Sequence, residues 1–213
     1  FAALIYTFYL FKQTQKNRYL YLFAVLCALV FLIRPLNILM IPGVLIVLGN
    51  WSDLSTFFKV LWSTKKPALL LAILIGGGIA FIQCLVWYAQ KGVLFIDSYT
   101  DESFDFSNPH ILDLLFSYKK GLFTYSPILF IGLLIALFQA IKRKKYIAIT
   151  TFGVPFFAFI LVLSSWWSWW YGMSYGQRSF IDILPIIFVP IAYGVNKLNI
   201  KSFLFVLPIL LLS

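Results

Sequence analysis

Charge is scarce in this chain. Only 11% of its 213 residues are charged and 7 are acidic, whereas 62% are hydrophobic and the mean hydropathy is +0.94. A soluble domain of this length could not bury so much apolar surface in one core. The sequence therefore excludes a soluble protein and predicts an integral membrane protein. The apolar runs are too many for a signal peptide to explain them.

Residues that bind metals or form disulfides are also few. Cys27 and Cys84 both fall inside apolar runs, so we expect small core residues and neither a disulfide nor a metal pair. The only histidine, His110, cannot form a zinc site without three good partners. Four acids share one polar loop; they could hold a divalent cation, but they lack the glycine and the spacing of a calcium loop, so a solvated loop is the first interpretation. They are Asp97, Asp101, Glu102 and Asp105.

The apolar runs predict an all-α polytopic bundle of about eight spans, forming a single transmembrane domain over 1–213. Two runs are short, and Pro35 between them predicts a broken pair that meets below the membrane surface. The runs at both ends are cut and Phe1 is not an initiator Met, so we expect a fragment of a larger protein. The amphipathic run 51–64 predicts an interfacial helix, and the glycines at 76–78 predict a close helix contact. The predicted spans are 1–11, 19–33, 36–49, 67–90, 122–141, 146–165, 180–195 and 202–213.

The basic residues fall on one side of these spans. Of the 17 lysines and arginines, 12 lie in the connections 12–18, 50–66, 142–145 and 196–201, and the positive-inside bias makes that side cytoplasmic. The other side holds six of the seven acids. Because the basic clusters are short and lie beside the membrane, the expected partners are anionic membrane lipids and not nucleic acid.

Two predicted outer loops stand out. The loop 91–121 is the only sizeable polar segment, and within it we expect a short apolar helix over 111–116. The loop 166–182 begins with a dense group of tryptophans and tyrosines. An interfacial aromatic belt would explain that group. The aromatic group continues directly into Gly176, Gln177 and Arg178, and this equally favours an aromatic surface that lines a binding site for a sugar ring or a prenyl chain.

Two arginines are the main candidates for ligand binding. Arg34 and Arg178 are both predicted near the outer boundary, where an arginine is costly unless an anion meets it. The planar fork of donors suits phosphate, so two converging arginines would bind a lipid-linked phosphate or diphosphate. Snorkelling to lipid headgroups is the simpler alternative. For Asp182, four residues after Arg178, a structural Arg178–Asp182 pair is the leading interpretation, ahead of a catalytic base.

Two sequence elements resemble a known family. Arg34-Pro35-Leu36-Asn37, between two short helices, is similar to the Arg-Pro-x-Asn element of multi-spanning glycosyltransferases of the GT-C type. The segment Trp169–Phe180, followed by Ile183-Leu184-Pro185, resembles the aromatic, glycine and arginine loop of the mannosyltransferase and aminoarabinose-transferase branch. The resemblance implies a polyprenyl-phosphate-linked sugar as donor, presented at the outer face of a bacterial plasma membrane. A lipid, glycan or protein acceptor would attack its anomeric carbon.

The resemblance also implies roles for individual residues. Arg178 and Arg34 would contact the donor phosphate. The family's catalytic carboxylate lies in the first outer loop and is expected upstream of Phe1, so this fragment alone is expected to be inactive. Ser179 departs from the pattern, because the family usually has an aromatic residue directly after the arginine. The residues expected to line the pocket are Asn37, Trp170, Tyr171, Tyr175, Gln177 and Asp182.

Two other functions remain open. A ligase or polymerase of surface polysaccharides also uses outer-face arginines on lipid diphosphates. A transporter or flippase of lipid-linked sugars would carry out no chemistry, but it should show repeat symmetry and polar residues near the bilayer midplane. Here the polar groups gather at one face and no internal repeat is found, which favours a surface site. The sugar, the acceptor and the oligomeric state stay open.

Overall fold

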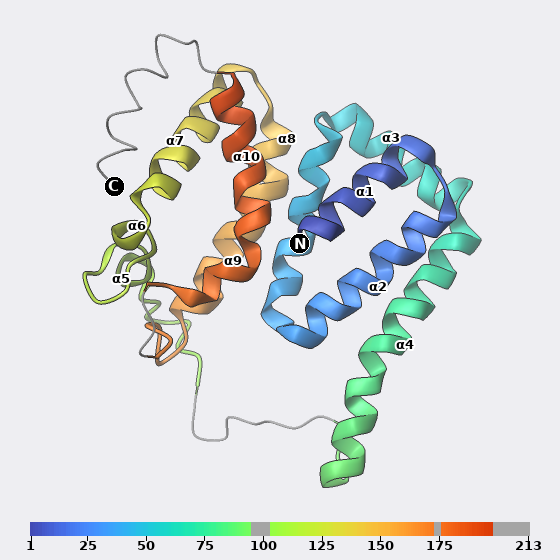
Figure 1. Ribbon diagram of the computed structural model, residues 1–213, viewed down its shortest axis with the longest axis horizontal. Coiled ribbons are helices and arrows are strands. Elements are labelled where there is room, and N and C mark those ends of the chain that lie inside the picture. The colour runs from blue at the N-terminus through green and yellow to red at the C-terminus, as the bar shows by residue number, and fades with distance from the viewer. Residues whose placement is uncertain (95–102, 173–175, 198–213) are drawn as a thin grey trace.

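The computed structural model describes residues 1–94, 103–172 and 176–197 (Figure 1). These residues form helices, with one isolated antiparallel bridge between Phe104 and Trp166, so the all-α prediction is confirmed for them. The elements in chain order are α1 Ala2–Thr14, α2 Asn17–Ile33, η1 Pro35–Leu48, α3 Trp51–Ser63, α4 Lys66–Lys91, α5 Ile111–Phe116, α6 Leu122–Tyr125, α7 Pro127–Lys142, α8 Tyr146–Ala148, η2 Ile149–Gly153, α9 Val154–Ser164, η3 Arg178–Ile183 and α10 Leu184–Asn196.

Three helical stretches of the described residues are long and apolar enough to cross a membrane. They are Lys66–Lys91, Tyr146–Ser164 and Arg178–Asn196. A fourth is possible if η1 and α3, which are bent by 112° at their junction, count as one broken span. At about 1.5 Å per residue, α2 and α7 each rise only about 25 Å, less than the roughly 30 Å of a hydrocarbon core. The structure therefore supports a membrane protein with fewer full-length spans than the eight predicted, and the predicted span 202–213 lies outside the described residues.

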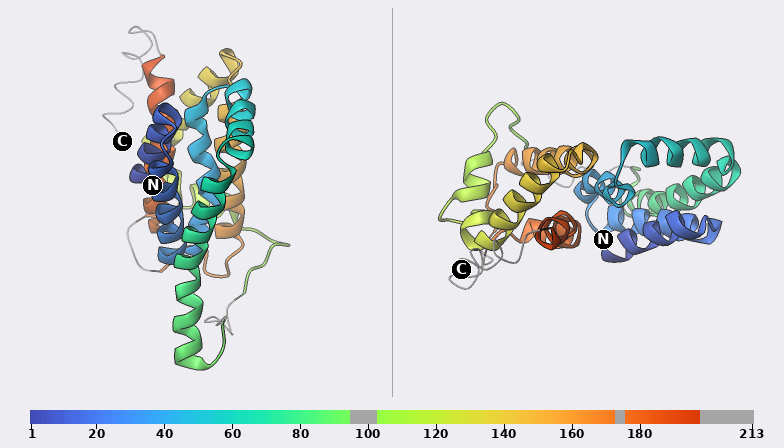
Figure 2. Two further views of the ribbon diagram at one scale, coloured as in Figure 1. Left: turned by 90° about the vertical axis from the view of Figure 1, so that its right-hand side faces the viewer. Right: turned by 90° about the horizontal axis from the view of Figure 1, so that it is seen from above.

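Helices α1 to α4 form one group and α7 to α10 another, with η1 between them, as the view from above shows (Figure 2). The larger core cluster joins the two groups: Met40 from η1, Phe159 from α9 and Ile183 from η3 are all buried in it. Close packing of such side chains holds η1 against η3. The core thereby fixes the two segments that begin at Arg34 and Arg178.

The basic connections 12–18, 50–66 and 142–145 lie at one end of the molecule, here called the lysine end (Figure 1). The corner between α2 and η1 lies at the opposite end of the molecule, together with η3, α5 and α6 (Figure 1). This end is here called the arginine end. Side-chain hydrogen bonds link the connections at the lysine end: Lys12 Nζ to Val47 O (3.1 Å), Lys65 Nζ to Asn17 Oδ1 (3.0 Å) and Lys145 Nζ to Asn50 Oδ1 (2.6 Å).

The close contact predicted from the glycines at 76–78 involves Gly76 alone. A Cβ atom on Gly76 would lie 3.1 Å from the carbonyl oxygen of Ala24 in α2, whereas Gly77 and Gly78 have nothing within 4 Å. Gly76 thus allows α4 to approach the backbone of α2. Helices are present over the predicted ranges 51–64 and 111–116, as α3 and α5.

Candidate functional site

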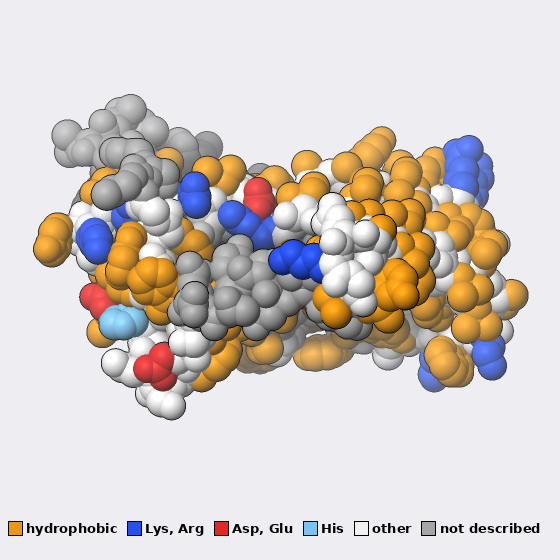
Figure 3. Space-filling view, turned by 90° about the horizontal axis from the view of Figure 1, so that it is seen from below, with side chains coloured by type: hydrophobic (Ala, Val, Ile, Leu, Met, Phe, Trp, Pro, Cys, Tyr) orange, Lys and Arg blue, Asp and Glu red, His pale blue; other side chains and the backbone are white. Residues whose placement is uncertain are grey.

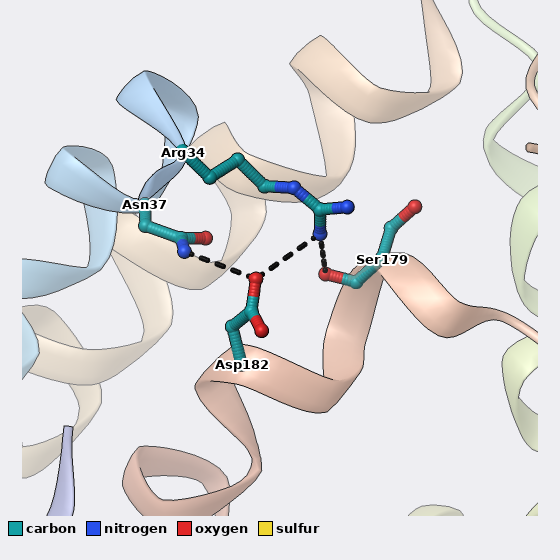
Figure 4. A network of polar contacts seen from close by, with 4 residues as sticks. All are labelled: Arg34, Asn37, Ser179 and Asp182. Carbon is teal, nitrogen blue, oxygen red and sulfur yellow. Dashed lines mark hydrogen bonds and ion pairs between the residues drawn. The ribbon is translucent and has the colours of Figure 1, made fainter. Parts of the chain in front are cut away.

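Arg34 stands at a corner that the sequence enforces. Pro35 cannot continue the hydrogen bonds of α2 and disfavours helical backbone at the residue before it. Arg34 accordingly adopts an extended conformation (φ −156°, ψ 106°) between α2 and η1, and its carbonyl accepts a hydrogen bond from Asn37 N (2.9 Å). The side chains of Arg34 and Asn37 extend from this corner toward η3 (Figure 4).

Asp182 of η3 connects the two segments. Its Oδ2 accepts hydrogen bonds from Arg34 Nη1 and from Asn37 Nδ2, each at 3.2 Å, and Arg34 Nη1 also donates to Ser179 O at 3.4 Å (Figure 4). The side chains of Arg34 and Asp182 are each 37% exposed, so the ion pair is half-buried. The charge of Arg34 is thus neutralised within the protein.

The predicted pairing of Arg178 with Asp182 is wrong, because the partner of Asp182 is Arg34. The prediction assumed an α-helix, in which residues four apart lie on the same face. Residues Arg178–Ile183 instead form a 3₁₀ helix. With three residues per turn, side chains four apart point about 120° away from each other.

Arg178 lies at the same end of the molecule, since the neighbouring Ser179 carbonyl contacts Arg34. Its side chain is exposed, and its Nη2 would lie 3.9 Å from a Cβ atom on Gly172. A third cation reaches the same glycine: the ammonium of Lys120 donates to Gly172 O. Sequence reasoning did not single out Lys120, because its burial depends on a contact 52 residues away.

Three buried polar atoms at the arginine end have no hydrogen-bond partner among the described residues. They are Asn37 Oδ1, Gln177 Oε1 and Ser179 Oγ, on side chains that are 2%, 7% and 1% exposed. Folded proteins rarely leave such atoms unsatisfied, and a ligand is one of the standard explanations. Asn37 and Gln177 were predicted site residues, whereas Ser179 was seen only as a departure from the family pattern.

The aromatic loop lies beside these groups. Tyr171 has a positive φ of 49°, and its hydroxyl donates to Leu163 O (3.3 Å). Burial raises the pKa of Tyr171, and nearby Arg34 opposes this only in part, so the phenol stays neutral at physiological pH. Trp170 packs edge-to-face on Trp169, with ring centroids 5.8 Å apart. Gln177 Nε2 donates to Trp169 O (3.3 Å), and Tyr175 lies outside the described residues.

The two predicted outer loops form one surface. The backbone of the first loop pairs with the end of α9, through Asp105 N to Ser165 O (2.7 Å) and His110 N to Ser164 O (2.9 Å). His110 stacks on Trp169 at 6.0 Å. Within the described part of the chain, no group of three potential metal ligands is present, and three of the four acids considered for a cation, Asp97, Asp101 and Glu102, lie outside it.

An apolar cavity opens next to the Arg34 corner. It has a volume of about 630 Å³ and lies among α1, α2, η1, α3 and α4. Phe31 and Ile38, which flank Arg34 within four residues, belong to its lining. Seen from the arginine end, basic side chains and an acidic one gather near the middle of the face, with hydrophobic side chains around them (Figure 3).

Comparison with known proteins identifies no family. No protein-family model, curated protein or solved structure significantly matches the chain. The candidate site therefore rests on its own geometry, which combines an ion-paired Arg34, two cations at Gly172 and three unsatisfied acceptors.

Proposed function

We propose that the chain is part of a membrane glycosyltransferase, which moves a sugar from a polyprenyl-phosphate donor to a lipid, glycan or protein acceptor at the outer face of a bacterial plasma membrane. The observation that carries this proposal is the set of three buried, unsatisfied acceptors beside the Arg34–Asp182 pair. Sugar hydroxyls both donate and accept hydrogen bonds, so a sugar would satisfy these groups once a local shift of the aromatic loop uncovers them.

The apolar cavity suits the lipid part of such a donor. Its volume of about 630 Å³ lies within the usual size range of ligand pockets, and nearly all its lining side chains are hydrophobic. Because Phe31 and Ile38 flank Arg34, a prenyl chain in this cavity would end near the polar groups. Trp170 and Tyr171 would then face the sugar ring, as the family resemblance implies.

The proposed chemistry is displacement at the anomeric carbon. An acceptor oxygen forms the new bond to that carbon while the bond to the phosphate oxygen breaks, and the phosphate keeps the electron pair. Positive groups that face the leaving phosphate stabilise the charge that develops there, which is the role proposed for Arg178. The acceptor's proton would pass to a carboxylate base, as the family resemblance implies, and none of the described residues is assigned that role. Asp182 already accepts two hydrogen bonds, so it is a positioning residue.

The polysaccharide ligase and the flippase are the competing functions. A ligase would use the same cations on a lipid diphosphate. The polar network lies at the arginine end, beyond the middle of the helices, which favours a surface reaction over a path through the membrane.

The test is sugar transfer by the complete protein in bacterial membranes. The substrates are radiolabelled polyprenyl-phosphate hexose, N-acetylhexosamine and pentose. We expect Arg178→Ala to lower transfer by about a hundredfold or more, because a charged contact to the leaving group is lost. Insertion into the membrane should stay normal, and Lys142→Ala, which removes a charge at the lysine end, should transfer like the wild type.

Two results would contradict the proposal. Full transfer by Arg178→Ala would remove Arg178 from the site. If the wild type transfers none of these sugars but moves a lipid-linked sugar across the bilayer, the protein is a flippase.

A further inference from the structure

The turn between α5 and α6 holds Lys120 in a fixed place. Gly121 N donates to Ser117 O (2.7 Å), and Lys119 N donates to Ser117 Oγ (3.1 Å). A Cβ atom on Gly121 would come within 2.6 Å of the carbonyl carbon of Phe116, so only glycine fits this turn. The turn directs Lys120 toward Gly172 of the aromatic loop.

Lys120 is a covered cation with no acidic partner among the residues that the structure describes. Its side chain is only 8% exposed, and its ammonium donates to the carbonyl of Gly172. Among the residues that the structure describes, no carboxylate lies within 4 Å of it. An ammonium carries three donors, and a single carbonyl neither uses them all nor balances the charge. Burial of such a group is costly unless an anion accompanies it.

Two more cations increase this cost. Arg178 Nη2 lies close to the same glycine, and Lys119 follows Lys120 directly in the turn. Lys119 Nζ lies 3.6 Å from the ring centroid of Trp170, which holds it beside the aromatic loop. Burial, Arg178 and Lys119 together lower the pKa of Lys120. The lowered pKa has the direction expected of an anion site without its anion.

Arg34 differs from these cations in one respect. Its guanidinium is already paired with Asp182, whereas Lys120 and Arg178 have no acidic partner among the described residues. An incoming anion gains most where positive charge is uncompensated. The phosphate is therefore better placed at Gly172 than at Arg34.

We propose that Lys120 and Arg178 together bind a phosphate group at Gly172, with Lys119 as an outer cation, and that Arg34 only positions the neighbouring segments. The identification of this phosphate with that of the donor lipid rests on the function proposed above. A tetrahedral phosphate offers oxygens to both cations at once, and the planar fork of Arg178 suits two of them. Lys120 would exchange its contact with the Gly172 carbonyl for the phosphate.

The experiment measures binding and needs no sugar transfer. Farnesyl phosphate and inorganic phosphate are titrated against the complete protein in phosphatidylcholine nanodiscs. The variants are Lys120→Gln, Arg178→Gln and, as a control of equal charge change, Lys142→Gln at the lysine end. We expect each of the first two to weaken farnesyl phosphate binding about tenfold or more, since each removes a charged hydrogen bond. The control should bind like the wild type.

Lys120→Gln should fold, because removing a covered charge with no acidic partner among the described residues offsets the loss of its one hydrogen bond to Gly172 O. A melting temperature at or above that of the wild type, together with weakened farnesyl phosphate binding, supports the proposal. Unchanged binding by Lys120→Gln overturns it, and so does equal weakening by Lys142→Gln.

A second arm identifies the source of the phosphate. If the site takes bilayer headgroups, phosphatidylglycerol nanodiscs will abolish farnesyl phosphate binding through competition. If it takes free phosphate, inorganic phosphate will bind as tightly as farnesyl phosphate. Either result overturns the assignment to a prenyl carrier. If farnesyl phosphate binding depends on Lys120 but the protein transfers no sugar, only the glycosyltransferase proposal is refuted. If sugar transfer depends on Arg178 but farnesyl phosphate binding does not depend on Lys120, only the phosphate site proposed here is refuted.

Discussion

The two ends of the molecule use polar groups in opposite ways. At the lysine end, Lys12, Lys65 and Lys145 each donate to an oxygen of another element. At the arginine end, three buried polar atoms have no partner among the described residues, and Lys120 has no acid within reach among them. Satisfied polar groups hold structure together, whereas unsatisfied ones raise the energy of the fold unless a ligand satisfies them.

This difference separates stability from function. A change at the lysine end should affect folding and leave ligand binding intact. A change at the unsatisfied groups should weaken ligand binding and leave folding intact. The two ends can therefore be compared with matched substitutions.

Among the matched substitutions that compare satisfied with unsatisfied polar groups, the largest effect is expected at Ser179. Its hydroxyl is buried and has no partner among the described residues, so Ser179→Ala should leave the free energy of unfolding unchanged or slightly raise it. Sugar transfer by the complete protein should fall about tenfold, which corresponds to one lost hydrogen bond of about 1.4 kcal/mol. Steady-state transfer rates and denaturant unfolding measure the two quantities.

Ser164→Ala is the matched control, because Ser164 is also buried but its hydroxyl donates to Leu161 O (3.0 Å). We expect it to lose stability and to keep transfer. If Ser179→Ala behaves like Ser164→Ala, the unsatisfied hydroxyl does not bind a ligand, and the contrast between satisfied and unsatisfied polar groups fails.

The next effect is expected at Lys12. Its ammonium donates to Val47 O (3.1 Å) and Leu48 O (3.5 Å), at the C-terminal end of η1 where helix carbonyls lack partners. Lys12→Met keeps the aliphatic chain and should lower the free energy of unfolding by about 1 kcal/mol, with transfer unchanged. Lys16→Met, at an exposed position in the same connection, should change neither. A loss of transfer in Lys12→Met without a loss of stability would show that the lysine end also serves function.

Much of the fold could be predicted from local sequence. The break at Pro35 follows from the covalent structure of proline, and helices α3 and α5 follow from apolar spacing. Arg34 and Asn37 share that corner, where Asn37 N donates to Arg34 O. The prediction of eight spans is not confirmed: three described helical stretches are long and apolar enough to cross a membrane, and the predicted span 202–213 lies outside the described residues.

The partners within the site could not be predicted. Asp182 lies 148 residues from Arg34, and the winding of η3 as a 3₁₀ helix decides which way Asp182 points. From the sequence alone Lys120 is an ordinary loop lysine. Its contact with Gly172 appears only in the folded structure. Such long-range contacts depend on core packing, which a single sequence does not show.

The smallest effect concerns the pH dependence of stability. The pKa of Lys120 lies below its ordinary value of 10.5, because of burial first and then of Arg178 and Lys119. Between the lowered pKa and 10.5, the unfolded chain binds more protons at this lysine than the folded protein does, so stability rises with pH across that window. Without ligand, the melting temperature of the wild type should rise slightly relative to that of Lys120→Gln as the pH increases toward 10.5. Bound farnesyl phosphate favours the charged ammonium and should remove the difference. A parallel pH dependence of wild type and Lys120→Gln, with and without this ligand, would mean that Lys120 is an ordinary solvated lysine.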